Sequence, residues 1–567
     1  MISQRLFWLA AIPLFVGLVL SSLINIHPNP QTVVYAEWAM ALAAVLSFAG
    51  WVIARPQGLE LRVGGAAGLI LLVLLACLGW QLRTPGLGYA VYLGLFLLCY
   101  ALGASLRSGT LVDAMAAGML GGALLQSLAG VLQLSGVTLG GLVMGKIYLQ
   151  AFGNVGQANH YADLLFLGLG SLSFLFARRW LNAWLALPLA AWLALAAAAS
   201  ASRGSLLYTA AFLVLGGLSL WRGDPAARRI GQALLVVAAF SVLAQALVTY
   251  GHILNSFGVT TALDRAGDAG SNGQRLFNWT AAWQAIVAHP WLGQGPATFY
   301  KASIDAMFTT PPATFPKFAE HAHNLPLNMG AEFGLPLTVL VIGGLLLWYL
   351  RQLLFVPTAA RMWALACVGV VGLHSMVEYP LWYAYLLVPV ALAMGVADGE
   401  NLRLPVLRLP LWLGAGVAAL AVVVLSWVAF DWFAVRAAYQ TLAAEEPDTK
   451  LATRIKAREQ LAKVSRYSVF ALHAESLRLQ SWHPDEGDAA QIADRCDAHW
   501  QYKPGWYLMM RCGEAYALSE RGPALKRIVV AMCDGFPYHR PALNDWARAY
   551  DEAAKRGYRI GGRACLQ

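Results

Sequence analysis

The stretch Leu325–Leu350, with the sequence LPLNMGAEFGLPLTVLVIGGLLLWYL, decides the fold class of this chain. It carries a single charged residue, and about 20 mainly apolar residues are enough for a helix to cross the hydrocarbon core of a bilayer. The polar run Glu320-His321-Ala322-His323-Asn324 stands directly before it. A carboxylate, two imidazoles and an amide are therefore expected where a water-facing loop meets the membrane, and we expect any chemistry of the chain there.

The composition indicates that this stretch is one of many. Of the 567 residues, 59% are hydrophobic and 12% are charged, whereas soluble globular proteins carry about 25% charged residues. The formal net charge of +10 comes from short loops and the C-terminal tail, without the basic stripe and interleaved aromatic residues that bind nucleic acid. The chain is therefore predicted to be a polytopic membrane protein, with the lipid bilayer and no nucleic acid as a partner.

The apolar windows predict an all-α protein with about thirteen transmembrane helices. The first window follows Arg5 and lacks a small-residue cleavage site before His27, so we expect it to remain as a helix. The windows cover residues 7–25, 33–53, 64–82, 87–105, 111–135, 159–177, 183–200, 204–221, 230–250, 325–350, 359–377, 381–397 and 410–433.

The arginine residues predict the orientation of these helices, because short loops rich in lysine and arginine stay in the cytoplasm. Loops 26–32, 136–158 and 374–380 are almost free of positive charge, and Arg83 and Arg203 are the exceptions to the alternation. We therefore expect a multi-pass protein of the bacterial inner membrane, with its N-terminus in the cytoplasm and its site facing the periplasm. The alternate connections carry Arg55, Arg62, Arg107, Arg178, Arg179, Arg222, Arg228, Arg229, Arg351, Arg361, Arg403 and Arg408.

Two domains follow from these patterns: a transmembrane domain, 1–433, whose large periplasmic loop is 251–323, and a soluble helical periplasmic domain, 434–567. We expect a binding or supporting role for the second domain. It holds Cys496, Cys512, Cys533 and Cys565, which suit two disulfides in an oxidising compartment, with the pairing left open. The alternative is four free thiols in a cytoplasmic tail. Cys77, Cys99 and Cys367 fall in apolar windows and are interpreted as packing residues.

Polar residues at membrane depth are costly, and each is by default a functional candidate. Gln157, Asn159 and His160 lie within one turn at the start of window 159–177. A plainer interpretation is an Asn or His cap on a helix N-terminus. Glu378 and Tyr379, in His374-Ser375-Met376-Val377-Glu378-Tyr379-Pro380, place a carboxylate and a phenol at the outer end of another helix.

Two arginines on the outer side suit phosphate binding, because a guanidinium can pair with two phosphate oxygens. Arg203 lies in a Ser/Gly-rich junction, and Arg275 precedes an amphipathic segment, 276–288. Together they could hold a diphosphate without a metal, although Arg203 alone could be an interfacial anchor. Arg265 is a further candidate, unless Asp264 and Asp268 simply neutralise it. A metal on His321 and His323 is weakly supported without an acidic motif nearby.

The ordered set of motifs resembles the O-antigen ligase/polymerase superfamily, and within it the PglL-type protein O-oligosaccharyltransferases. The resemblance covers about 150–400 and rests on the motifs Gly156-Gln157-Ala158-Asn159-His160, Ser202-Arg203-Gly204, Arg275 before Trp279, His323-Asn324 and Glu378-Tyr379-Pro380. It implies transfer of a glycan from undecaprenyl diphosphate to a Ser or Thr hydroxyl of a periplasmic or pilin-like protein. Close relatives transfer the glycan to the lipid A core or to another glycan chain.

This resemblance implies an inverting, metal-independent reaction with no cofactor. His323 would take the proton of the acceptor hydroxyl, since an imidazole with a pKa near 6.5 suits a general base. Glu320, His321 or Tyr379 would orient that imidazole or the donor, while Arg203 and Arg275 would bind the diphosphate. A transporter or flippase is the competing class, but no inverted repeat is apparent and the charged groups gather on one face. A third alternative is a non-catalytic membrane anchor for the tail.

Overall fold

The computed structural model describes residues 6–55, 57–80, 87–106, 109–259, 261–262, 269–310, 318–443, 451–464, 467–553, 560 and 565. The candidate Arg265 and the topological exception Arg83 lie outside these residues. Within them the chain is helical almost throughout, which confirms the prediction of an all-α polytopic fold.

The apolar helices coincide with the windows read from the sequence. Eight in the described part of the chain are long and apolar enough to cross a bilayer, and five more are shorter, so the number of crossings stays a prediction. The eight are α3 (Val34–Ile53), α5 (Leu87–Ala104), α6 (Thr110–Leu134), α7 (Ala158–Ala177), α9 (Gly204–Arg222), α10 (Pro225–Thr249), α15 (Leu335–Leu354) and α18 (Leu411–Ala443). The five are α2 (Trp8–Leu20, continued by η1, Ser21–Leu23), α4 (Gly65–Trp80), α8 (Ala183–Ala198), α16 (Ala359–His374) and α17 (Ala384–Gly399).

The window 325–350 is two helices instead of one: α14 (Leu325–Phe333) ends at Gly334, and α15 follows. Gly334 has a φ of 79°, which glycine adopts without strain. A Cβ at this position would also lie 2.4 Å from the carbonyl oxygen of Trp291. A close approach of another backbone therefore fixes the break, and hydropathy does not reveal it.

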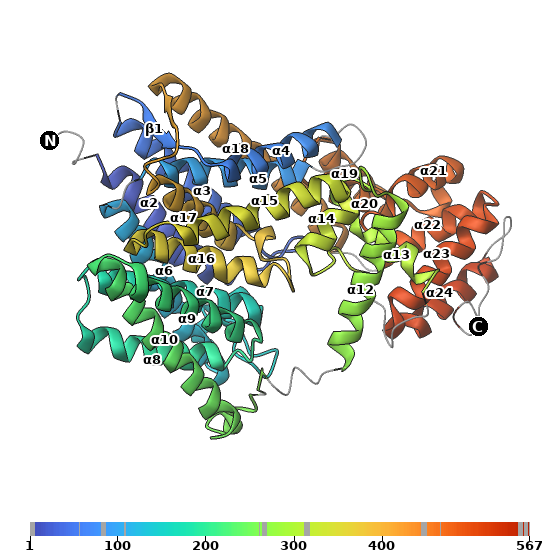
Figure 1. Cartoon of the computed structure of the whole chain (residues 1–567). Coiled ribbons are helices and arrows are strands. Elements are labelled where there is room, and N and C mark those ends of the chain that lie inside the picture. The colour runs from blue at the N-terminus through green and yellow to red at the C-terminus, as the bar shows by residue number, and fades with distance from the viewer. Residues whose placement is uncertain are drawn as a thin grey trace. The chain divides into compact units, whose positions relative to one another are not determined.

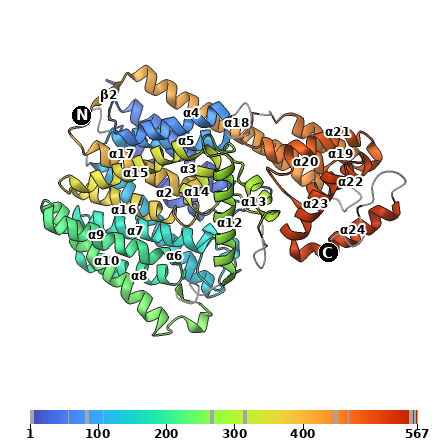
Figure 2. The ribbon, with the colours of Figure 1, turned by 45° about the vertical axis from the view of Figure 1, so that its right-hand side comes forward.

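The contacts within the chain define two units, and the first comprises residues 1–73, 92–268 and 340–425. In it α6 to α10 lie side by side, as both views show (Figures 1 and 2), and α16 packs on α7, α9 and α17. Large side chains fill this core without exposure, among them Tyr161, Phe166, Phe174, Tyr208 and Trp363.

One end of this first unit, which we call the arginine end, gathers the loops predicted to be cytoplasmic. Arg178 at the end of α7 forms an ion pair with Asp113 of α6 at 2.9 Å, and Arg229 donates to the carbonyl oxygen of Phe176. A two-stranded antiparallel sheet also lies in these loops, β1 (Leu59–Arg62) against β2 (Val406–Leu409), which the sequence analysis did not predict. Strands of four residues from distant loops leave too short a pattern to detect.

The second unit comprises residues 74–91, 269–339 and 426–567. Its middle segment contains α12 (Ala269–Ala288), α13 (Phe299–Met307) and α14, which pack on one another. The amphipathic helix expected over 276–288 is the C-terminal part of α12. Its buried face (Phe277, Ala281, Ala282, Ala285 and Ile286) meets Phe299, Ala322 and Ala331 in a small apolar core.

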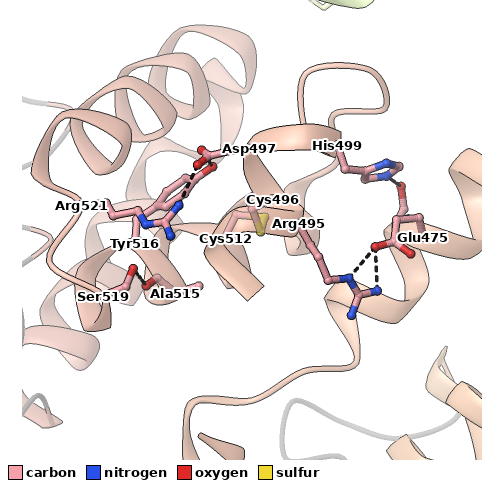
Figure 3. Close-up of a disulfide and its surroundings, with 11 residues drawn as sticks. Glu475, Arg495, Cys496, Asp497, His499, Cys512, Ala515, Tyr516, Ser519 and Arg521 are labelled. Atoms are coloured by element: carbon pink, nitrogen blue, oxygen red, sulfur yellow. Dashed lines mark hydrogen bonds and ion pairs between the residues drawn. A yellow bond between two sulfur atoms is a disulfide. The ribbon is translucent and has the colours of Figure 1, made fainter. Parts of the chain in front are cut away.

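The tail of the second unit is a set of short helices, shown in orange to red in Figure 1. They are α19 (Leu451–Ala462), α20 (Ala471–Gln480), α21 (Ala489–His499), α22 (Trp506–Leu518), α23 (Gly522–Gly535) and α24 (Arg540–Ala553). The predicted two disulfides are confirmed, Cys496–Cys512 and Cys533–Cys565, and the three cysteines in the apolar windows are buried and free. Beside the first disulfide, Tyr516 and Arg521 both donate to Asp497 (Figure 3), so α21 and α22 are also joined by polar contacts.

Candidate active site

The start of α7 does not use its polar residues as helix caps. Gln157 occupies the N-cap position without a side-chain hydrogen bond to the backbone among the described residues. Oδ1 of Asn159 instead accepts the hydroxyl of Ser202 at 2.9 Å, and Nδ1 of His160 lies 2.9 Å from the hydroxyl oxygen of Tyr385. The interpretation of these residues as simple caps is therefore wrong, because both side chains join α7 to other elements.

The Asn159–Ser202 hydrogen bond brings together two groups of candidates that the sequence presents separately. Ser202 is buried, and Arg203 follows it as the N-cap residue of α9 with a partly exposed side chain. The preceding Ala201 has a φ of 51°, so the α8–α9 junction is a tight turn. Arg203 therefore begins its helix at a fixed place beside the first turn of α7.

The Glu378-Tyr379-Pro380 element lies at the same end of the first unit, which we call the histidine end. It leads into the 3-10 turn η5 (Pro380–Trp382) and α17. The ring of Tyr379 stacks on that of Tyr383 at 6.1 Å, and Tyr383 meets the ring of His160 edge-on at 4.4 Å. Glu378 is buried, 7% exposed, and lies within electrostatic reach of His160. Four predicted candidates of the first unit (Asn159, His160, Glu378 and Tyr379) thus lie in one neighbourhood.

The structure adds buried acids that the sequence analysis did not select. Oδ2 of Asp163 lies 2.6 Å from Nδ1 of His374. Oε2 of Glu37 on α3 accepts the hydroxyl of Tyr92 at 2.7 Å and the backbone N–H of Ala384, the first residue of α17. A carboxylate inside an apolar window was the available signal in both cases, because such residues are functional candidates by default.

The run from Glu320 to Asn324 belongs to the second unit and is fixed by two asparagines. Asn324 is the N-cap of α14, with Oδ1 accepting the N–H of Leu327 at 2.9 Å, while Asn328 accepts the N–H of Ala322 at 3.0 Å. His321 is 7% exposed, but His323 is partly exposed. His323 also has a φ of 53°, in the left-handed region that Asn, Asp and His adopt more often than most non-glycine residues.

Glu320 is more exposed than its neighbours and is contacted from two elements. Its Oε2 accepts the hydroxyl of Tyr300 on α13 at 3.4 Å, and its Oε1 lies 3.8 Å from the ammonium of Lys503. Desolvation opposes ionisation of this carboxyl, but Lys503, His321 and His473 outweigh it and hold the pKa of Glu320 below its ordinary value. Tyr300, Lys503 and His473 are not among the predicted site residues, because no local sequence pattern connects them with the run from Glu320 to Asn324.

Two further residues of the second unit are candidates. Arg275 is partly exposed on α12, the helix that packs against α13 and α14. Glu332 on α14 is buried, 1% exposed, and faces the hydroxyl of Tyr89 and the backbone N–H groups that begin α13. Within the described residues, no group of three or more His, Cys, Asp or Glu side chains could hold a metal ion.

The fold and these residues define a polytopic membrane protein with polar groups gathered at one end of its first unit and in a histidine-bearing loop of its second. Residues 188–342 match the family model described as O-antigen ligase, and residues 362–541 match the one described as virulence factor membrane-bound polymerase, C-terminal. These two matches confirm the resemblance of the chain to this superfamily.

A curated relative is the general O-oligosaccharyltransferase of Acinetobacter baylyi, which is 26% identical over 261 residues. That match covers 46% of this chain and 45% of the relative, so it spans about half the length of each protein. Arg203, Arg275 and the Glu320–Asn324 run fall in the segment that matches the ligase model, and Glu378 and Tyr379 fall in the polymerase segment.

Proposed function

We propose that this protein is a lipid-linked oligosaccharide transferase that acts at the periplasmic face of the inner membrane. It transfers a glycan en bloc from undecaprenyl diphosphate to a Ser or Thr hydroxyl of a periplasmic or pilin-like protein. The observation that carries the proposal is the place of His323, a partly exposed histidine directly before the Asn324 cap in the segment that matches the ligase model. The relative from Acinetobacter baylyi is named for transfer of an oligosaccharide to oxygen.

The chemistry needs few catalytic groups. The acceptor oxygen attacks the anomeric carbon, the bond from that carbon to the phosphate oxygen breaks, and undecaprenyl diphosphate leaves. His323 takes the proton of the acceptor hydroxyl as a general base. Because the attack is in line with the leaving group, the anomeric configuration inverts. Diphosphate is a good leaving group, so the protein has only to stabilise its charge and activate the hydroxyl.

Each remaining candidate has a role in this reaction. Arg203 and Arg275 bind the diphosphate through their planar guanidinium groups, in place of a metal. Glu320, His321 and Tyr379 orient the base or the donor. The other donor-binding candidates from the sequence are Gln157, Asn159, His160, Arg265 and Glu378.

The test is reconstitution of the purified protein in liposomes with an undecaprenyl-diphosphate-linked oligosaccharide and three acceptors offered together: a pilin, lipid A core and a second glycan chain. Mass spectrometry of each acceptor then identifies the product. Glycosylated pilin supports the proposal. A second candidate function is transfer to the lipid A core or to a glycan chain, which the matches to the ligase and polymerase models also support. In that case only one of these two acceptors would be modified. Movement of the donor across the bilayer without transfer would indicate a flippase instead.

A further inference from the structure

The tail helices and the segment before the histidine-bearing loop share one apolar core. Ile304 of α13 is fully buried among tail residues, in the cluster that contains Met509, Ile528 and Met532. The ring of Phe318 meets that of Phe536 edge-on at 5.2 Å. Gly535 permits this contact, since a Cβ there would lie 2.2 Å from the Phe318 ring. The tail therefore packs both on α13, through Ile304, and on Phe318, which lies just before the run from Glu320 to Asn324.

A polar contact reinforces this packing. The guanidinium of Arg527 on α23 lies 2.5 Å from Asp305 of α13 and 4.7 Å from the centre of the Phe308 ring. Lys301 also binds Asp305, at 2.7 Å on the same helix face. The position of α13 against the tail is thus fixed by burial, charge and a cation–π contact.

Lys503 extends the same interface to the loop itself. It lies in the turn between α21 and α22, with its side chain 24% exposed. Its ammonium is 3.8 Å from Oε1 of Glu320 and 5.7 Å from the centre of the Tyr300 ring, whose hydroxyl donates to the other oxygen of Glu320. One carboxylate is therefore held from α13 on one side and from the tail on the other.

We propose that the C-terminal domain is an integral part of the candidate active site, and that Lys503 is a positioning residue that holds Glu320 and, through it, the loop that presents His323. This proposal makes the binding or supporting role expected from the sequence specific. It rests on the proposed function for its effect on catalysis, but the holding of the loop can be measured without any substrate. A partly exposed ion pair contributes little to global stability, so its main effect is on the geometry of the loop.

The experiment compares full-length Lys503→Ala, Lys503→Arg and wild-type protein in detergent, with Lys526→Ala as the matched control. Lys526 is an exposed lysine on α23 of the same domain. Hydrogen–deuterium exchange is followed in the peptide that covers 318–324. We expect Lys503→Ala to raise the exchange rate there several-fold, with no change in α21 or α22, while Lys503→Arg and Lys526→Ala behave as wild type.

Charge reversal provides a second measurement that a general folding defect would not reproduce. Lys503→Glu should raise exchange in 318–324 further, and the double variant Lys503→Glu/Glu320→Lys should restore it. With the undecaprenyl-diphosphate-linked donor and a pilin acceptor, Lys503→Ala should lower kcat about ten-fold and leave the donor KM unchanged, since small displacements of a catalytic group reduce the rate strongly.

The outcomes separate the two proposals. Unchanged exchange in 318–324 for both Lys503→Ala and Lys503→Glu would overturn the positioning role, whatever the activity. A normal kcat in Lys503→Ala with raised exchange would overturn its link to catalysis. If wild-type protein modifies none of the acceptors while the exchange results are as expected, the proposed function fails and the structural part of the inference stands.

Discussion

Asp163 and His374 form a fully enclosed pair: Oδ2 lies 2.6 Å from Nδ1, and the two side chains are 0% and 2% exposed. The other oxygen of Asp163 accepts the hydroxyl of Tyr208 at 2.7 Å. One carboxylate thus ties together α7, α9 and α16, the helices whose ends carry candidate site residues. Because both side chains are buried, removal of this carboxylate would take the acceptor away from the ring of His374 and the hydroxyl of Tyr208.

Asp163→Ala should therefore lower the free energy of unfolding by about 3–5 kcal/mol, the range for breaking a buried pair on one side. Asp113→Ala is the matched control at the arginine end, since its partner Arg178 is 38% exposed and water can solvate it. We expect that variant to lose about 1 kcal/mol. Thermal unfolding of the purified proteins in detergent measures both, and equal losses would contradict the importance of the enclosed pair.

Replacement of His323 by Ala should lower glycan transfer by about 10²–10⁴-fold, the usual contribution of a positioned base, and leave donor binding intact. Arg203→Lys and Arg275→Lys should instead weaken donor binding, because lysine keeps the charge and loses the planar fork. Arg228→Lys, exposed near the arginine end, is the control. Transfer and donor binding are measured separately for each variant.

Near-normal transfer by a folded His323→Ala protein would remove His323 from the mechanism. Addition of a chelator should change nothing if the two arginines act in place of a metal. Strict dependence on a divalent ion would point instead to a metal bound by His321 and His323.

The membrane orientation predicts which exposed positions a membrane-impermeant thiol reagent reaches from outside spheroplasts. Cysteines introduced at Trp291 and Leu451, which are 76% and 50% exposed, should be labelled. A cysteine introduced at Trp221, 77% exposed and next to Arg222, should be labelled only after lysis. Protection of position 451 in intact spheroplasts would place the tail in the cytoplasm and overturn the topology.

The stability of the tail should fall as the pH drops from about 6.5 towards 4. Burial lowers the pKa of His499 to about 4, with smaller effects of Glu475, Arg495 and Lys503. The folded tail therefore keeps this histidine neutral while the unfolded chain takes up a proton, so acid favours unfolding. A shift of this size corresponds to about 3 kcal/mol. His499→Gln should flatten the pH dependence of tail unfolding, measured by pulse proteolysis between pH 7 and pH 4.

Exposed His539 provides the control for this measurement, since its environment is open to water. His539→Gln should leave the pH dependence as in wild type. An unchanged profile in His499→Gln would show that another group carries the acid sensitivity. His473 is the next candidate, because burial lowers its pKa to about 3.

Sequence alone determined the features that depend on local composition. A bilayer of fixed thickness selects apolar runs of about 20 residues, so most windows located their helix to within about five residues. The exceptions are window 325–350, which contains α14 and most of α15, and window 410–433, because α18 continues to Ala443. The four tail cysteines predicted two disulfides, because disulfide formation depends on an oxidising compartment. The predicted membrane topology indicates that compartment without knowledge of how the tail folds. The arginine-rich loops likewise lie at the arginine end of the first unit, where Arg178 follows α7 and pairs with Asp113.

Only the tertiary structure decided which polar residues meet. The Asn159–Ser202 and Asp163–His374 contacts join helices that local patterns treat as independent, and Gly334 breaks a uniformly apolar window because a distant backbone approaches it. Lys503 lies in another domain of the sequence from Glu320, and no spacing rule links them. Apolar burial depends on residue type and can be read from sequence, whereas hydrogen bonds and ion pairs need particular atoms within about 3–4 Å, which the packing of the whole chain determines.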